Sequence, residues 1–200
     1  MGSDPVGTPE LTPNPAISPR QSRGERSATA TVAGDTIAVC AGLLALTAAG
    51  AGAGVIWPGL AGFTAPHPTL HPTLEAIVAI STNNGRVLAL AFILTLARFD
   101  TNRRSRQLGD AVLTIVLGVN AVNVGVALGR WQARLLPYLP HLPVEYLAAA
   151  AAAGVWCNAR RHASRGQRTP TRAVVAYAAG TLLLVTVAAS SEVLLTPHAP

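Results

Sequence analysis

Five apolar segments, each near the length that crosses a lipid bilayer, constrain the fold of this chain more than any other feature. A bilayer core about 30 Å thick requires a helix of about 20 apolar residues, and an α-helix satisfies all its backbone polar groups internally. The sequence therefore predicts an all-α, polytopic membrane helix bundle with about five transmembrane helices. The expected spans are residues 36–56, 74–96, 108–129, 144–160 and 173–195.

The composition agrees with a membrane protein and argues against nucleic-acid binding. Half of the 200 residues are hydrophobic and only 12% are charged, which is more apolar than an ordinary soluble domain. The formal charge is +6, and every basic residue is an arginine. These arginines lie mainly in short segments between the apolar runs, where membrane orientation explains them better than nucleic acid does.

The first 30 residues differ from the rest of the chain. They are rich in Pro, Gly, Ser and Thr and contain few large apolar residues, so they cannot bury enough surface to offset chain entropy. We expect residues 1–30 to form a disordered, Pro-rich cytoplasmic tail, and residues 31–200 to form the transmembrane domain. A cleaved signal peptide is the alternative for the first apolar run, but the run is longer than a usual signal core.

The arginines also predict an orientation. Counted segment by segment, twelve lie in the tail and the second and fourth connections, and two, Arg130 and Arg134, lie in the third. Because positive residues stay on the cytoplasmic side, this distribution predicts the orientation of a multi-pass membrane protein. Its N-terminus would be cytoplasmic and its C-terminus outside.

Several kinds of chemistry find no support in the sequence. His67 and His71 have metal-ligand spacing, but a proline follows each and disfavours the helix that would bring them together. Cys40 and Cys157 fall toward the cytoplasmic ends of their spans, where thiols stay reduced. No zinc-protease, nucleophile-elbow or phosphate-loop motif is present. We therefore expect no catalytic residue, no metal ligand and no cofactor.

Polar residues within the spans gather toward the outer side under this orientation. A buried polar group in lipid is costly, roughly 2.5–3.5 kcal/mol for a central arginine, so we expect the group to face inward and share one pocket. Such residues either join helices by hydrogen bonds or form a site for a ligand, peptide or ion. Arg86 should pair with Glu192, or else with Glu145. The pocket residues expected are Asn83, Asn84, Arg86, Asn120, Asn123, His141, Glu145 and Glu192.

The segment from Pro140 to Glu145 opens the fourth span. Pro143 suits a first helical turn, because its missing N–H is not needed there. Glu145 then lies near the positive end of the helix dipole. His141 stands four residues earlier, so a helix extended back to it would place both side chains on one face.

These same residues resemble the stage II sporulation protein M family of bacterial membrane proteins. The order and spacing of the family's elements agree over residues 75–197, while Leu142 replaces the usual Gly and no Gly follows Asn120 directly. The matching elements are Asn83-Asn84, Asn120 with Gly125 and Gly129, Pro140 to Glu145, and Glu192 followed by Thr196-Pro197.

The resemblance implies a location in the bacterial inner (cytoplasmic) membrane. It also implies a non-enzymatic membrane scaffold or accessory protein in cell-envelope or peptidoglycan remodelling. It also leaves open a component for maturation, export or immunity of a ribosomally made bacteriocin-like peptide. An intramembrane hydrolase built on His141 and Glu145 is a third hypothesis, without a recognisable nucleophile. The expected partners are the lipid bilayer, other membrane or envelope proteins or a peptide, and a second copy of the chain as a homo-oligomer.

Overall fold

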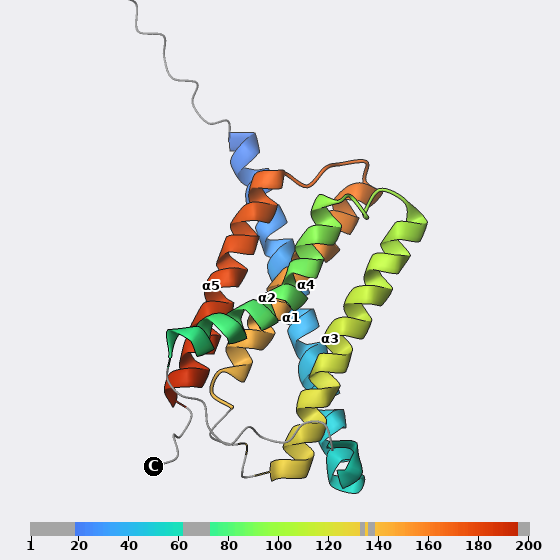
Figure 1. The fold of residues 1–200 in the computed structure, drawn as a ribbon. Coiled ribbons are helices and arrows are strands. Elements are labelled where there is room, and N and C mark those ends of the chain that lie inside the picture. Colours follow the sequence, from blue (N-terminus) through green and yellow to red (C-terminus); the bar gives the residue numbers. More distant parts are fainter. Residues whose placement is uncertain (1–18, 62–72, 133–134, 136–138, 196–200) are drawn as a thin grey trace, which may run out of the picture.

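The computed structural model describes residues 19–61, 73–132, 135 and 139–195, and the side chains of residues 19–30 and 61 lie outside that description. Within these ranges the chain is all-helical, as predicted, with five long α-helices and one 3-10 turn (Figure 1). The helices are α1 (Pro19–Ile56), α2 (Leu74–Leu96), α3 (Arg103–Trp131), α4 (Leu142–Ser164) and α5 (Thr171–Leu195), with η1 at Pro58–Ala61 after α1.

Four of the five described helices are long and apolar enough to cross a membrane, namely α1 from Thr31 onward, α2, α3 and α5. Large apolar side chains cover their outer surfaces; Ile37, Ile115 and Leu183 are each more than 60% exposed. A soluble monomer rarely exposes so much apolar surface to water. The chain is therefore an integral membrane protein.

Each predicted span lies within one of these helices, and α2 alone of the five described helices has the predicted bounds. α2 begins and ends where expected, and its N-cap Thr73 accepts a hydrogen bond from the Ala76 N–H at 3.1 Å. α1 begins at Pro19, well before the predicted start of the first span. Arg, Gln, Glu and Ala in residues 19–35 favour helix, and lengthening an existing helix costs little. Residues 1–18 of the expected tail lie outside the described ranges.

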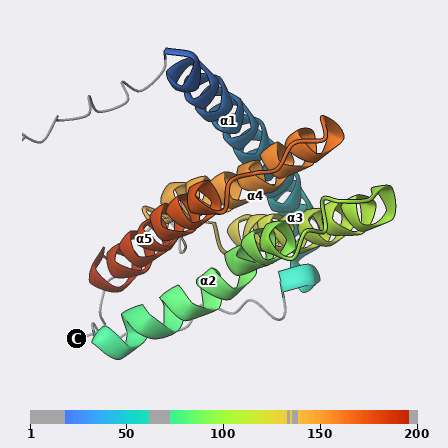
Figure 2. The same cartoon turned by 90° about the horizontal axis from the view of Figure 1, so that it is seen from above.

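Helix α4 occupies the centre of the bundle. It packs against α1, α2 and α5, whereas α3 joins the bundle mainly through α1. Figure 2 shows α4 between α1 and α5 when the bundle is seen from above. The run of alanines from Leu147 to Gly154 contains several side chains with no exposed surface, such as Ala148 and Ala150, because small residues let neighbouring backbones approach. The fourth span is therefore shielded by the others, which explains its lower apolarity.

Helices α1 and α3 make the most extensive contact, and glycines on both sides permit it. They form two pairs with the same four-residue spacing, Gly50 with Gly54 and Gly125 with Gly129. A Cβ atom at Gly50 would lie 2.6 Å from the Val122 carbonyl oxygen, and a Cβ at each of the other three would also strike a carbonyl oxygen of the facing helix.

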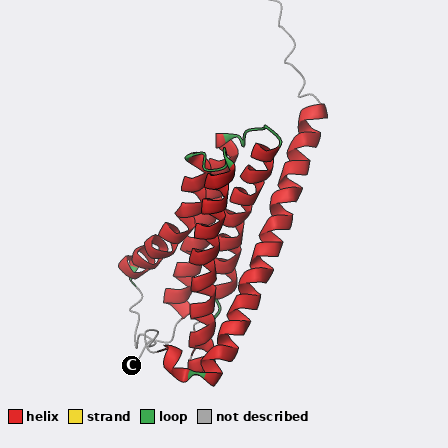
Figure 3. Ribbon diagram, turned by 90° about the vertical axis from the view of Figure 1, so that its right-hand side faces the viewer, coloured by secondary structure: helices red, strands yellow, loops and turns green. Residues whose placement is uncertain are grey.

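Helix α2 bends near its middle, and its first half leans away from α3 (Figures 1 and 3). Gly85 lies in the middle of α2, and glycine is a weak helix former that permits a helix to bend. Although α2 and α3 are consecutive, they make few contacts with each other. The bend therefore leaves a space between them at one end of the bundle.

Candidate functional site

A cavity of about 630 Å³ lies at the end of the bundle where α4 begins and α5 ends. We call it the α2–α3 cavity. Its walls come from the first half of α2, the last part of α3, the connection that follows α3, and the facing ends of α4 and α5. Most of its lining is apolar, for example Ile80, Val124 and Leu128, and its polar lining residues are Asn83, Asn84, His141, Glu145 and Glu192.

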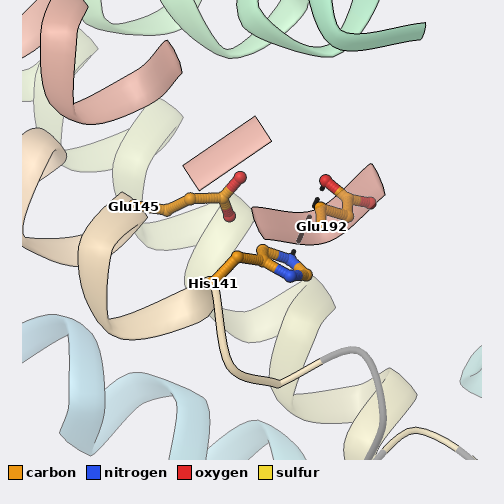
Figure 4. Close-up of side chains that lie close together, drawn as sticks. All are labelled: His141, Glu145 and Glu192. Atoms are coloured by element: carbon orange, nitrogen blue, oxygen red, sulfur yellow. Dashed lines mark ion pairs between the residues drawn. The ribbon is translucent and has the colours of Figure 1, made fainter. Parts of the chain in front are cut away.

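Three of these polar residues converge at one point. The side chains of His141, Glu145 and Glu192 each place a nitrogen or oxygen atom within 4.8 Å of the others. The Nε2 atom of His141 lies 3.9 Å from a carboxylate oxygen of Glu192. Figure 4 shows His141 and Glu145 reaching from the start of α4 toward Glu192, which comes from α5. We call these three residues the His-Glu-Glu cluster.

The start of α4 positions two members of the cluster. His141 is the N-cap residue and has helical backbone angles, φ −82° and ψ −22°. Its carbonyl oxygen accepts the Glu145 N–H at 3.1 Å, so both side chains lie on one face as the spacing predicted. Pro143 occupies the first turn, also as predicted.

Asn84 fixes the orientation of Glu145. The Asn84 amide Nδ2 donates to Glu145 Oε1 at 2.5 Å, across the interface between α2 and α4. The imidazole of His141 is only 12% exposed, and burial lowers its pKa from the ordinary value. Desolvation disfavours the charged form of the ring, so burial favours the neutral imidazole.

A smaller cavity of about 180 Å³ continues from Glu145 toward the middle of the bundle, where Asn84, Asn120 and Tyr146 help to line it. Buried Thr47 of α1 forms a short hydrogen bond with the Tyr146 hydroxyl and donates to the Ala121 carbonyl oxygen at 3.2 Å. This bridge ties α1, α3 and α4 together below the His-Glu-Glu cluster. The sequence analysis did not identify Thr47 or Tyr146 as pocket residues, because a single uncharged Thr or Tyr in an apolar segment gives no signal of a polar contact.

The structure brings together only part of the predicted pocket. Asn83, Asn84, His141, Glu145 and Glu192 share the α2–α3 cavity. Asn120 lines the smaller cavity and donates to the Val116 carbonyl of its own helix at 2.7 Å. Asn123 lines neither cavity.

Arg86 does not form the predicted pair with Glu192. It is exposed on the surface of the bundle and makes no ion pair or hydrogen bond with any described residue. Asn84, which meets Glu145, precedes it by two residues, and two residues turn a helix by about 200°. Because the side chain of Asn84 faces α4, the side chain of Arg86 faces away from α4. The residue that lies beside Glu192 is His141.

Ion pairs at the opposite end of the bundle were missed by the sequence reading, which used these arginines only to orient the chain. Arg161 of α4 makes a two-point contact with Asp35 of α1, including an Nη1–Oδ1 hydrogen bond of 2.7 Å. Arg160 donates to Asp110 Oδ1 of α3 at 2.8 Å, and the indole of Trp156 donates to the same oxygen at 2.9 Å. Isolated aspartates in otherwise apolar helices were the available signal.

The fold and the cluster thus define a class, a polytopic helical membrane protein with an acidic, histidine-containing cavity at one end. Comparisons with protein-family models, curated proteins and solved structures gave no match. Cys40 and Cys157 are both free thiols, and His67 and His71 lie outside the described residues.

Proposed function

We propose that this chain is a non-enzymatic accessory protein of the bacterial inner membrane, which holds a segment of a partner envelope protein in the α2–α3 cavity. The supporting observation is the cavity itself. Its volume of about 630 Å³ is within the usual range for small-molecule sites, and it combines apolar walls with one polar cluster. Such a lining suits an amphipathic segment better than a fully polar substrate.

The lining also favours holding over covalent catalysis. No Ser, Thr or Cys is among the described residues that line the cavity, so a hydroxyl or thiol nucleophile next to His141 is missing from that part of the chain. The resemblance of residues 75–197 to the stage II sporulation protein M family supports a scaffold in cell-envelope or peptidoglycan remodelling.

The cavity would open toward the outer face of the membrane. The α2–α3 and α4–α5 connections lie at the same end of the bundle as the start of α1 (Figure 1), and this end holds the arginine-rich connections. By the positive-inside rule that end is cytoplasmic. The His-Glu-Glu cluster lies at the other end, where a partner exposed outside the cell could reach it.

A peptide is the second candidate occupant. Two carboxylates in an apolar cavity would also suit a cationic, amphipathic peptide of the bacteriocin kind. The genes beside this one distinguish the two functions: cell-wall hydrolases or division genes favour the scaffold, and a precursor peptide with an exporter favours peptide handling.

Site-specific photocrosslinking in the producing cells tests the proposal. A benzoylphenylalanine residue would replace Ala79 or Ala127, which line the cavity on α2 and α3, and Leu183, which is 65% exposed on α5, serves as the matched control. Both cavity positions should capture the same discrete protein, and the control should not. A second change, Ala127→Trp, fills the cavity and should abolish capture from position 79.

Three outcomes would contradict the scaffold. Capture of a small peptide from the cavity positions would favour peptide handling, whereas an identical pattern from all three positions would show that the cavity holds nothing specific. Hydrolysis of a peptide by the purified protein, abolished by Glu145→Gln, would show that it is an enzyme.

A further inference from the structure

The His-Glu-Glu cluster has the composition and spacing of a metal site. One imidazole nitrogen and two carboxylate oxygens from α4 and α5 lie within 4.8 Å of one another. Ligands around a tetrahedral zinc ion stand about 3.3 Å apart, since each lies about 2.0–2.1 Å from the metal. Side-chain rotations that move each ligand atom by about 1 Å would therefore bring all three atoms to one ion. No helix would need to move.

Among the described residues, no arginine forms an ion pair with either carboxylate of the cluster. The one side chain beside them that can carry a positive charge is His141, whose Nε2 atom lies 3.9 Å from Glu192. Arg86 of α2 is exposed and makes no ion pair or hydrogen bond with the cluster. Two partly buried carboxylates this close repel each other, and a cation between them would remove that repulsion.

From this geometry we infer that His141, Glu145 and Glu192 bind a divalent transition-metal ion of the Zn²⁺ class. A neutral imidazole is a good ligand for zinc, and carboxylate oxygens complete the set. The ion would link the first turn of α4 to the last turns of α5. Three protein ligands would leave a further coordination position, and all three residues line the α2–α3 cavity.

Asn84 would act as the outer support of this site. Its amide donates to Glu145 Oε1, which holds the carboxylate in place and leaves the other oxygen for the ion. Partners of this kind orient metal ligands, and their loss commonly weakens binding about 10- to 100-fold. The inference does not depend on the proposed partner of the cavity.

The first experiment uses the wild-type chain, purified in detergent without a histidine tag. Diethyl pyrocarbonate modifies accessible imidazoles, and peptide mass spectrometry reports each histidine separately. Zn²⁺, added with excess Mg²⁺ in the buffer, should slow modification of His141 at least ten-fold. His162 is the internal control, because its ring contacts the Asn158 carbonyl oxygen at the other end of α4, and its modification rate should not change.

The second experiment compares Zn²⁺ affinity among variants by calorimetric titration. Glu192→Gln and His141→Ala should each weaken the Zn²⁺ binding at this site at least ten-fold, Asn84→Ala should weaken it about 10- to 100-fold, and His162→Ala should leave it unchanged. Equal protection of His141 and His162 by Zn²⁺, or an affinity unchanged by Glu192→Gln, would overturn the inference. If a variant does not fold, the protection of His141 in the wild-type chain decides the question alone.

Discussion

Asp110 serves as the common acceptor for two side chains of the central helix. The Trp156 indole and the Arg160 guanidinium both donate to its Oδ1 atom. Trp156 is 2% exposed, so its N–H has no access to water as an alternative acceptor. Arg160 is 41% exposed, so its part of the interaction is screened by solvent.

Asp110→Ala should therefore destabilise the protein by about 1–3 kcal/mol, mainly by leaving the buried indole N–H unsatisfied. Combining it with Trp156→Phe, which removes that donor, should recover part of the loss. The measurement is unfolding in detergent of the wild type, the two single variants and the double variant. Additive losses would show that the indole and Asp110 do not interact.

At the scale of the helices, the α1–α3 contact depends on direct packing of the two backbones against each other. The facing glycines leave no room for side chains, and a Cβ at Gly125 would strike the Thr47 carbonyl oxygen. Gly118 lies two turns earlier on the same helix, and a Cβ there would only touch the Leu46 side chain at 3.7 Å. The two positions thus provide a matched pair within α3.

Gly125→Ala should lower the free energy of unfolding by about 1–3 kcal/mol, because α1 and α3 must separate to admit the methyl group. Gly118→Ala should leave it unchanged or raise it slightly, since alanine favours helix over glycine. Unfolding in detergent measures both variants. Equal effects at the two positions would mean that the helices do not approach as closely as described.

The helices themselves were predictable from the sequence, because runs of apolar residues of bilayer length have few other stable conformations in lipid. The shared face of His141 and Glu145 was also predictable, since it follows from local helix geometry. The Arg86 pairing was wrong because it depended on which face of α2 meets α4, and a bend and a packing choice set that face. Asp35 and Asp110 were missed for a similar reason, as their partners lie on a distant helix.

Across the whole molecule, the arginine ion pairs and the His-Glu-Glu cluster lie at opposite ends of the bundle. One end carries the arginine-rich connections and the Asp35 and Asp110 ion pairs, and the other carries the His-Glu-Glu cluster and its cavity. The orientation in the membrane therefore decides which compartment the cavity faces.

Cysteine labelling with a membrane-impermeant reagent tests that orientation, in a background where Cys40 and Cys157 are replaced by alanine. In intact cells the reagent should modify a cysteine placed at Pro140, near the cluster. It should not modify one at Arg104 or Arg165, because the positive-inside rule assigns these to the cytoplasm. Modification at Arg104 in sealed cells would reverse the assigned orientation.

The buried position of α4 at the centre of the bundle has a consequence for insertion of the protein into the membrane during synthesis. The insertion machinery admits each segment according to its apolarity, and α4 is not among the helices that qualify by length and composition alone. It carries Glu145 near its beginning and buried Asn158 near its end. Two of the helices that pack against α4, α1 and α2, are made before it, and the third, α5, is made after it. Contacts with α1 and α2 would therefore stabilise α4 in the membrane until α5 is inserted, so the order of synthesis contributes to assembly of the bundle.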